Sequence, residues 1–317
     1  MTTIHTSKSK VAVTGAFGYS GSYITQRLLD HGHEVITLTN SLNREHRFGD
    51  RIRACPFHFD QPNQLCDSLR GVEVLINTYW VRFDHQLFSH QAAVTNTKLL
   101  FQAARQAGVR RIVHVSITKP DVHSPLPYFS GKAELEATLQ SLGGSYCILR
   151  PTVLFGKEDV LINNIAWSLR HLPVFGVFGR GDYRLQPIYV DDLAALAVQE
   201  AGGHENKIIN AIGPETFTYR QLAETIKQRL GSKSLIVGLP PSIGYWACRL
   251  VGMIVKDVVI TREEIRGLME ERLYVDAPPQ GTTKLSTWIE QHKATLGRHY
   301  TSEMARRIDR AARYRSN

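Results

Sequence analysis

Apolar runs and amphipathic stretches alternate along the first 150 residues of the chain. Short apolar runs predict strands at 11–14, 34–39, 54–59, 72–78, 111–116 and 145–149, and helical periodicity predicts helices at 19–31, 91–107 and 128–141. The strand runs are almost continuously apolar, which is typical of parallel strands buried on both faces. This order predicts an α/β fold, a doubly wound parallel sheet with helices on both faces.

After residue 151 the alternation loosens. Helices are predicted at 160–171 and 219–230, strands at 208–212 and 235–239, and three further helical stretches toward the end. Asp191 or Asp192 is expected to cap the helix that follows, and Thr218 the helix at 219–230. We predict a larger α/β domain over 9–235, with insertions of a second lobe from 151 on, and a helical region over 236–317 that completes this smaller substrate lobe.

The first predicted strand leads directly into a glycine-rich loop, TGAFGYSG at residues 14–21. In such a loop the first glycine allows a tight turn, the second lets the backbone approach a pyrophosphate and the third lets the helix pack on the sheet. The following helix N-terminus offers N–H groups to the phosphates. Because the loop joins a strand to an amphipathic helix, it predicts an NAD(P)-binding Rossmann-type domain rather than an ordinary turn. The residues expected to bind the cofactor here are Thr14, Gly15, Phe17, Gly18, Tyr19 and Gly21.

The end of the second strand bears on the choice between NAD and NADP. An acidic residue there would hold a free ribose 2′-OH, but the sequence has Asn40 and no acid, followed by Arg44 and Arg47. Arginines suit a 2′-phosphate, so NADP(H) is favoured over NAD(H), although both arginines could instead be solvated loop residues. Further expected cofactor contacts are Phe59 and Asp60 near the adenine and Asn77 at the end of the fourth strand.

A tyrosine and a lysine four residues apart, Tyr128 and Lys132, lie on the helix predicted at 128–141. Residues at this spacing share a helical face, so the ammonium can lower the pKa of the phenol. Tyr128 could then exchange a proton with a substrate oxygen that Ser116 holds, while hydride moves to or from the nicotinamide. Lys132 is also expected to bind the cofactor. A surface tyrosine and lysine with no such role are the alternative.

These motifs resemble the extended, atypical short-chain dehydrogenase/reductases of the NAD-dependent epimerase/dehydratase superfamily. The resemblance rests on the glycine loop, Tyr79, Asn96, HVSI at 114–117, YFSGK at 128–132 and LRPTVLFG at 149–156, in that order. RPTVLFGKED at 150–159, QPIYVDD at 186–192 and IGPE at 212–215 are most similar to the NADPH-binding accessory subunit of respiratory complex I and its bacterial relatives. The similarity covers about residues 9–230.

Two classes of function follow from this resemblance. The retained Ser116, Tyr128 and Lys132 favour an oxidoreductase or an epimerase/dehydratase-like enzyme that acts on a small molecule. The alternative is a non-catalytic NADPH-binding accessory or assembly protein of a membrane redox complex, in which Tyr128 and Lys132 hold the nicotinamide ribose. The fold alone does not separate these classes.

A substrate is expected beyond the carboxyl ends of the strands. The candidate substrate residues are Tyr79, Trp80, Arg82, Phe155, Asn163, Asn164, Trp167 and Arg184, with core packing as the alternative for each aromatic. The thirteen histidines show no metal-binding spacing, so we predict no metal and interpret them as scattered surface residues.

Composition indicates the class of protein, and the charge distribution identifies a basic tail. With 43% apolar and 21% charged residues the chain is an ordinary globular protein, and its four cysteines show no paired spacing. The N-terminus has no signal-peptide pattern, so we expect a cytoplasmic protein, or one peripheral to the inner membrane.

More than half of the net charge of +9 lies from Lys293 onward. A helix at 301–315 with Arg306, Arg307, Arg310, Arg313 and Arg315 is expected either to be solvated or to contact an anionic membrane or acidic protein, and no nucleic acid is expected.

Overall fold

The computed structural model describes residues 8–309 and 311. The chain forms two compact units. Unit 1 comprises 1–150 and 193–209, and unit 2 comprises 151–192 and 210–317, so the chain passes from one unit to the other three times.

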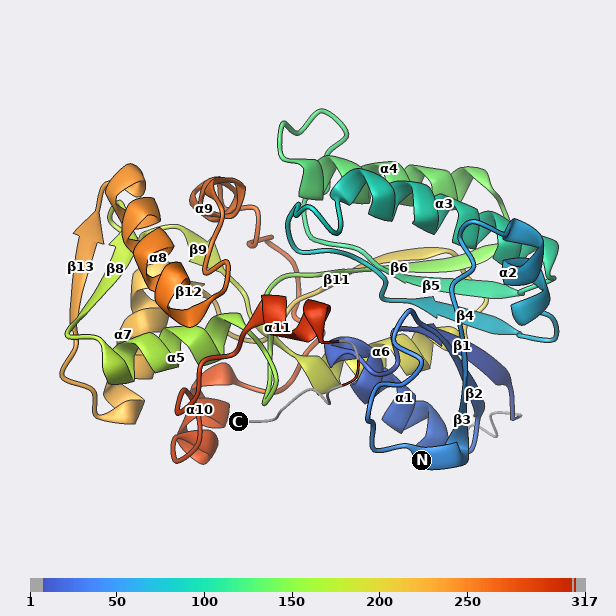
Figure 1. Ribbon diagram of the computed structural model, residues 1–317, viewed down its shortest axis with the longest axis horizontal. Helices are drawn as coiled ribbons and strands as arrows, with labels where there is room; N and C mark the ends of the chain where they lie inside the picture. The colour runs from blue at the N-terminus through green and yellow to red at the C-terminus, as the bar shows by residue number, and fades with distance from the viewer. Residues whose placement is uncertain (1–7, 310, 312–317) are drawn as a thin grey trace. The chain divides into compact units, whose positions relative to one another are not determined.

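Unit 1 contains a seven-stranded sheet of order β11-β6-β5-β4-β1-β2-β3 (Figure 1). Its strands are β1 (Lys10–Thr14), β2 (Glu34–Leu38), β3 (Ile52–Cys55), β4 (Val74–Asn77), β5 (Arg111–Val115), β6 (Ser145–Pro151) and β11 (Lys207–Ala211). The pairs among the first six strands are all parallel. The order reverses at β1, as in a doubly wound Rossmann-type sheet, which confirms the predicted fold class.

Helices cover both faces of this sheet. They are α1 (Tyr19–Asp30), α2 (Pro62–Ser68), α3 (His90–Gln106), α4 (Pro127–Ser141) and α6 (Val190–Ala201), and a short 3₁₀ turn lies at Gly49–Arg51. Figure 1 shows α3 and α4 over one face and α1 and α6 over the other. The central strands are largely apolar because both faces of the sheet are covered, as in Val74–Asn77, where all four residues are buried and three are apolar.

The segment that returns to unit 1 is tied to the sheet by Arg111. Its side chain is fully buried, and Nε donates to Glu200 O at 2.5 Å while Nη1 donates to Ser145 Oγ and Glu205 O. Glu200 lies 3.3 Å from Nη2 and neutralises the charge. These bonds join β5, β6 and the chain beyond α6.

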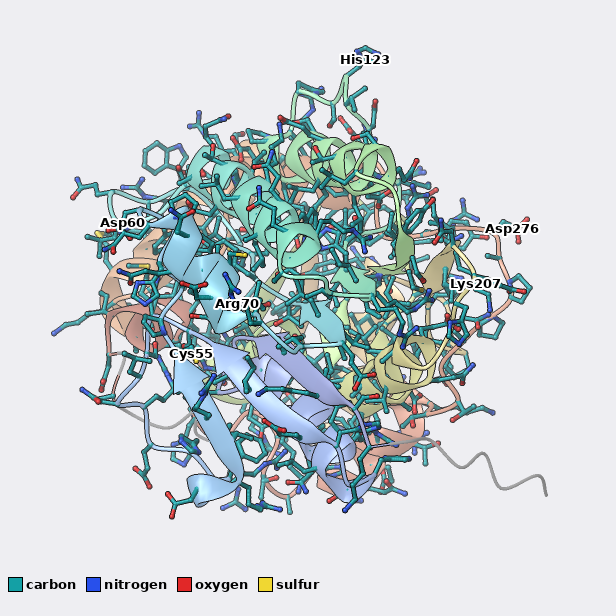
Figure 2. All side chains as sticks on the ribbon, turned by 90° about the vertical axis from the view of Figure 1, so that its right-hand side faces the viewer. Cys55, Asp60, Arg70, His123, Lys207 and Asp276 are labelled. Carbon is teal, nitrogen blue, oxygen red and sulfur yellow. The ribbon has the colours of Figure 1, made fainter. Side chains whose placement is uncertain are left out.

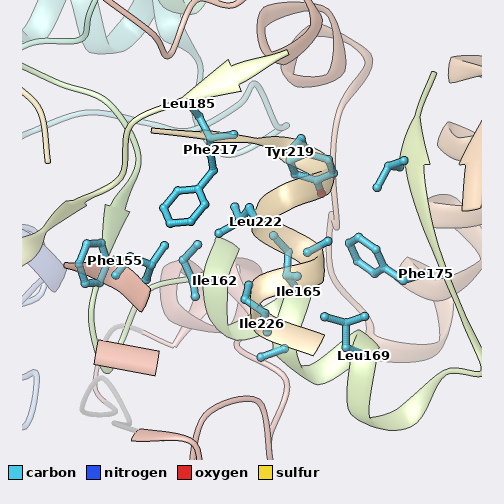
Figure 3. Close-up of a cluster of buried hydrophobic side chains, with 14 of the residues drawn as sticks. Phe155, Ile162, Ile165, Leu169, Phe175, Leu185, Phe217, Tyr219, Leu222 and Ile226 are labelled. Carbon is cyan, nitrogen blue, oxygen red and sulfur yellow. The ribbon is translucent and has the colours of Figure 1, made fainter. Parts of the chain in front are cut away.

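Unit 2 is built from short strands and helices around its own core. It contains β7 (Leu154–Phe155), α5 (Leu161–His171), β8 (Val174–Phe178), β9 (Arg184–Leu185), β10 (Ile188–Tyr189), β12 (Phe217–Thr218), α7 (Tyr219–Leu230), β13 (Leu235–Leu239), α8 (Pro241–Val255), α9 (Arg262–Met269), α10 (Leu285–His292) and α11 (Glu303–Ile308). Figure 3 shows Ile162, Ile165 and Leu169 of α5 beside Leu222 and Ile226 of α7. Thr218 caps α7 through a capping box, as predicted.

Two predicted boundaries are wrong, each for a local reason. The third strand ends at Cys55 rather than 59, because Pro56 supplies no N–H to continue the ladder. Figure 2 labels Cys55 and, further along the chain, Asp60. Helix α6 begins at Val190, so Asp191 and Asp192 lie inside its first turn. The Asp192 carboxylate instead accepts hydrogen bonds from the N–H groups of Thr282 and Thr283.

The basic tail forms a shorter helix than predicted, α11. The Asp257 carboxylate accepts hydrogen bonds from Tyr300 Oη and from the N–H groups of Glu303 and Met304. Met304 is buried, and Arg306 donates to Glu158 O. Arg310, Arg313 and Arg315 lie outside the described residues. Within the part of the chain that the structure describes, no helix is long and apolar enough to cross a bilayer.

Candidate functional site: a dinucleotide cradle and a buried lysine

The glycine loop folds back on itself between β1 and α1. Gly15 has φ +66°, and the Gly18 N–H donates to Gly15 O at 2.8 Å. A Cβ on Gly21 would lie 2.2 Å from Gly15 O, so only glycine lets α1 begin this close to the turn. Gly18 is the N-cap of α1 and makes no side-chain cap bond. The first turn of α1 can therefore direct its N–H groups toward an anion.

These residues fit a bound nicotinamide dinucleotide. The loop provides close backbone approach at Gly15 and Gly21, and the helix N-terminus provides positive electrostatic potential for a pyrophosphate. Two predicted cofactor residues lie within this loop: Phe17 is buried, and Tyr19 is the first residue of α1. When bound, the cofactor would supply hydride chemistry, whereas the chain supplies the phosphate cradle.

A polar network lies under the carboxyl ends of β1, β4 and β5. Thr14 Oγ1 donates to Asn77 Oδ1 at 2.9 Å and accepts from the N–H groups of Thr78 and Tyr79. Asn77 Nδ2 lies 3.0 Å from His114 Nδ1. Burial, and then the nearby Lys132, lower the pKa of His114 well below its usual value. Thr14 and Asn77 thus hold strand ends together, and their expected cofactor contacts stay predictions.

The tyrosine–lysine pair lies on the first turns of α4. Lys132 is buried, and its Nζ donates to Val115 O at 2.7 Å, at the end of β5. Burial lowers the pKa of Lys132 to about 7, with Glu136 acting in the opposite direction. Ser116 follows directly, and its buried Oγ has no hydrogen-bond partner among the described residues. An unpartnered hydroxyl beside this lysine is suited to receive a polar group of a ligand.

Trp80 covers this pair, a contact that the sequence analysis missed. The Lys132 ammonium lies 4.3 Å from the Trp80 ring centroid, a cation–π contact, and the Trp80 ring meets Tyr128 edge-on at 5.7 Å. A Cβ on Gly131 would lie 3.0 Å from Trp80, so the glycine between Tyr128 and Lys132 makes room for the indole. His90 packs on both Trp80 and Tyr128, with ring centroids 5.7 and 5.8 Å away.

The residues expected at the adenosine end lie in loops after β2 and β3. Asn40 and Asp60 are exposed. Phe59 is half-buried and stacks on Phe57 at 4.6 Å. Arg44 is buried, whereas Arg47 is exposed and donates to Ser22 O in α1. Thus Arg47 is held beside the helix whose N-terminus carries the glycine loop.

Each predicted substrate residue has contacts inside its own unit. In unit 1, Tyr79 Oη accepts from Asn96, Trp80 covers Lys132, and the Arg82 guanidinium lies 5.5 Å from the Phe83 ring. The residues of unit 2 pack or bond locally: Phe155 on Trp288, Asn163 with Asp159, Asn164 with Thr301, Trp167 on His171, and Arg184 with Glu271. Phe155 is fully buried, which favours core packing for this residue.

The interpretation of the histidines as surface residues is wrong for two of them. His114 lies inside β5 and is fully buried, and His90 opens α3 and is buried beside Tyr128. His90 Nδ1 also lies 2.8 Å from Asp84 Oδ1. His114 lies within the apolar run IVHV, and His90 lies at the start of an amphipathic helix. These two positions were the signal in the sequence that could have indicated burial. Across residues 8–309 and 311, no group of three acidic, histidine or cysteine side chains is placed to hold a metal ion.

A family comparison agrees with this geometry. The sequence profile of the NAD dependent epimerase/dehydratase family matches residues 11–211, well over half of the chain. The protein belongs to this family. The matched range contains the glycine loop, Ser116, Tyr128 and Lys132.

Curated relatives carry names of respiratory subunits. The chain is 28% identical over 241 residues to the mitochondrial NADH dehydrogenase [ubiquinone] 1 alpha subcomplex subunit 9 of Arabidopsis thaliana, covering 72% of this chain and 60% of that protein. It is 26% identical to the mitochondrial NADH-ubiquinone oxidoreductase 40 kDa subunit of Neurospora crassa, covering 73% and 63%. The chain thus spans about six tenths of the length of these relatives. The expected cytoplasmic location is contradicted by these matches, because both relatives are named as mitochondrial proteins.

Solved structures share the fold. The triphenylmethane reductase of Citrobacter sp. superposes with a TM-score of 0.77 at 18% identity, covering 90% of this chain and 100% of that one. The NADPH-dependent quinone oxidoreductase of Escherichia coli, complexed with NADPH, superposes with a TM-score of 0.67 at 20% identity, covering 94% and 98%. These likenesses, together with the cradle, support a nicotinamide cofactor.

Proposed function

We propose that this protein holds NADPH as a non-catalytic accessory or assembly protein of a membrane redox complex. The observation that carries the proposal is the packing of the tyrosine–lysine pair. Trp80 and His90 pack on Tyr128, and Trp80 also covers the Lys132 ammonium. For a substrate oxygen to reach Tyr128 Oη from the side of these rings, the indole would have to move. A cofactor-holding role needs only the cradle and the lysine.

The names of two curated relatives support the same proposal. Both are named as subunits of NADH dehydrogenase or NADH-ubiquinone oxidoreductase, which are membrane redox complexes. Because these relatives extend beyond the region that this chain matches, the partners of this chain are part of the proposal.

An oxidoreductase or epimerase/dehydratase-like activity is the second candidate. It is favoured by one observation, the unpartnered Ser116 Oγ next to Lys132 in a chain that retains Tyr128. In that case Tyr128 exchanges a proton with the substrate while Ser116 orients the substrate oxygen.

Tyr128→Phe separates the two candidates. The substitution removes one hydroxyl and keeps the aromatic contacts with Trp80 and His90. We expect the variant to bind NADPH within about twofold of the parent and to restore growth and complex assembly in a strain that lacks the gene, because a holding role needs no proton transfer. A general acid–base role would cost about 10²–10⁴ in turnover. Retained NADPH affinity with failed complementation would therefore favour the enzyme.

Cofactor preference is tested by replacing the arginines after β2. We expect NADPH to bind more tightly than NADH, and Arg44→Ala with Arg47→Ala to weaken NADPH by about tenfold while leaving NADH unchanged, because charge-assisted bonds to a 2′-phosphate would be lost. Quenching of tryptophan fluorescence measures both affinities. Arg70→Ala is the matched control, since Arg70 is exposed, pairs with Asp67 and precedes the amino end of β4. Equal losses for both cofactors would contradict the 2′-phosphate assignment.

A further inference from the structure

Helix α8 exposes five large apolar side chains and buries its two glycines. Ile243, Trp246, Leu250, Met253 and Ile254 are between 55 and 79% exposed. They recur at intervals of three, four and seven residues, so they form one stripe along the helix. We name this stripe the α8 face. It contains five of the thirteen large hydrophobic side chains that are exposed in the described part of the chain.

The opposite side of α8 packs closely on unit 2. Gly244 and Gly252 are the buried residues of the helix. A Cβ on Gly244 would lie 2.8 Å from the Phe178 ring of β8, and one on Gly252 would lie 2.7 Å from Asp257 O in the chain that follows the helix. Gly244 therefore lets the helix pack on β8, and Gly252 lets the following chain turn back against the helix. Because rotation would drive larger side chains into these contacts, the α8 face stays turned outward.

The charged residues of α8 and of its C-terminal cap are basic. The fifteen residues of α8 contain no aspartate or glutamate. Exposed Arg249 lies 5.8 Å from the Trp246 ring, and exposed Lys256 ends the helix. Arg262 is also exposed and stacks on Tyr245 of α8. The acidic Asp257 beside the helix end is already bonded to Tyr300 and to the start of α11.

We propose that the α8 face inserts into the surface of an anionic lipid bilayer. An apolar stripe with a tryptophan at its border and cations beside it is the pattern of a helix that lies in the interface plane, where the apolar side chains enter the acyl boundary and the cations meet lipid phosphates. The helix is about 22 Å long at 1.5 Å per residue, too short for the ~30 Å hydrocarbon core. This inference does not depend on whether the cofactor site is catalytic.

Vesicle sedimentation of the purified full chain tests this proposal. We expect binding to vesicles of phosphatidylcholine mixed with phosphatidylglycerol, weaker binding to phosphatidylcholine alone, and loss of binding at high salt. Leu250→Asp should lower the partition coefficient by about tenfold or more, because a carboxylate replaces an inserted apolar side chain. Arg249→Glu should lower it severalfold on anionic vesicles only. Leu87→Asp is the matched control, since Leu87 is 68% exposed in unit 1.

Trp246 provides a direct probe. Its fluorescence should shift to shorter wavelength on anionic vesicles, and Trp246→Phe should lose this shift. The proposal is overturned if the full chain ignores anionic vesicles, or if Leu250→Asp and Leu87→Asp sediment alike. It is also overturned if sedimentation equilibrium shows that Leu250→Asp converts a dimer into a monomer while vesicle binding is unchanged, since the α8 face would then join two copies. All these side chains are exposed, and thermal unfolding checks that each variant stays folded.

Discussion

Gly18→Asp is expected to abolish binding of both NADPH and NADH while the protein stays folded. Gly18 is the N-cap of α1 with φ −86° and ψ −177°, a conformation that any residue adopts. Aspartate is among the preferred N-cap residues, so the helix itself gains a cap bond. The same carboxylate occupies the anion position at the helix N-terminus and repels a pyrophosphate. Affinity for both cofactors should fall by at least about a hundredfold, or ~2.7 kcal/mol, as measured by calorimetry.

Two further glycine variants control for this result. Gly21→Ala should destabilise unit 1, because its Cβ would lie 2.2 Å from Gly15 O. Gly202→Ala should change neither stability nor affinity, since its Cβ would meet only Gln199 O at 3.6 Å. Thermal unfolding of all three variants separates loss of the anion position from loss of the fold. Tight NADPH binding by a folded Gly18→Asp protein would contradict the assignment of the loop as the phosphate cradle.

Lys132→Met is expected to stabilise the cofactor-free protein at neutral pH and to weaken NADPH binding. In the folded state burial lowers the pKa of Lys132 to about 7, whereas the unfolded chain keeps a pKa near 10.5. Between these values the unfolded state binds more protons, so the free energy of unfolding of the parent should rise from pH 7 to about pH 10. Below pH 7 the folded protein carries the full cost of a buried ammonium, on the order of several kcal/mol.

Denaturant titrations across this pH range measure the effect. The methionine variant should lack the rise with pH and exceed the parent in stability at pH 6, even though Val115 O loses its donor. Lys98→Met is the matched control: Lys98 is partly exposed on α3 and pairs with Glu134, and its loss should leave the slope unchanged. A parent whose stability rises no more steeply than that of the methionine variant from pH 7 to pH 10 would show that Lys132 stays charged in the folded state.

Local signals in the sequence predicted the parts of unit 1 that depend on neighbours along the chain. The glycine loop and the buried strands follow from residues a few positions apart, and Gly15 has the positive φ that its place in the turn requires. The contact of Trp80 with Lys132 depends on residues about fifty positions apart, and no periodicity encodes it. For the same reason the burial of His90 beside Tyr128 could not be read from its neighbours.

Unit 2 was harder to predict because several of its glycines lie within strands and helices, whereas glycine-rich sequence is usually typical of loops. The glycine-rich segment after α5 resembles a loop, yet Val174–Phe178 forms a strand that pairs with β13. A Cβ on Gly176 would lie 2.7 Å from Leu239 Cδ1, so a larger residue there would displace the leucine side chain. In α8 the apolar sequence suggests burial, but the glycines occupy the inner side, and only tertiary packing decides which side faces solvent.

The return of residues 193–209 to unit 1 has a consequence for synthesis on the ribosome. The N-terminal segment of unit 1 emerges first, but two of the partners of Arg111, Glu200 and Glu205, are translated only after the first segment of unit 2. Until β11 is added, β6 is an open edge of the sheet, the kind of edge that pairs with other chains. Throughout this interval the nascent protein therefore has an Arg111 cation that lacks the Glu200 carboxylate and the Glu200 and Glu205 carbonyl acceptors, and a strand edge that is unpaired. Unit 1 can therefore be completed only after translation has passed well beyond Lys132, the last residue of the tyrosine–lysine pair.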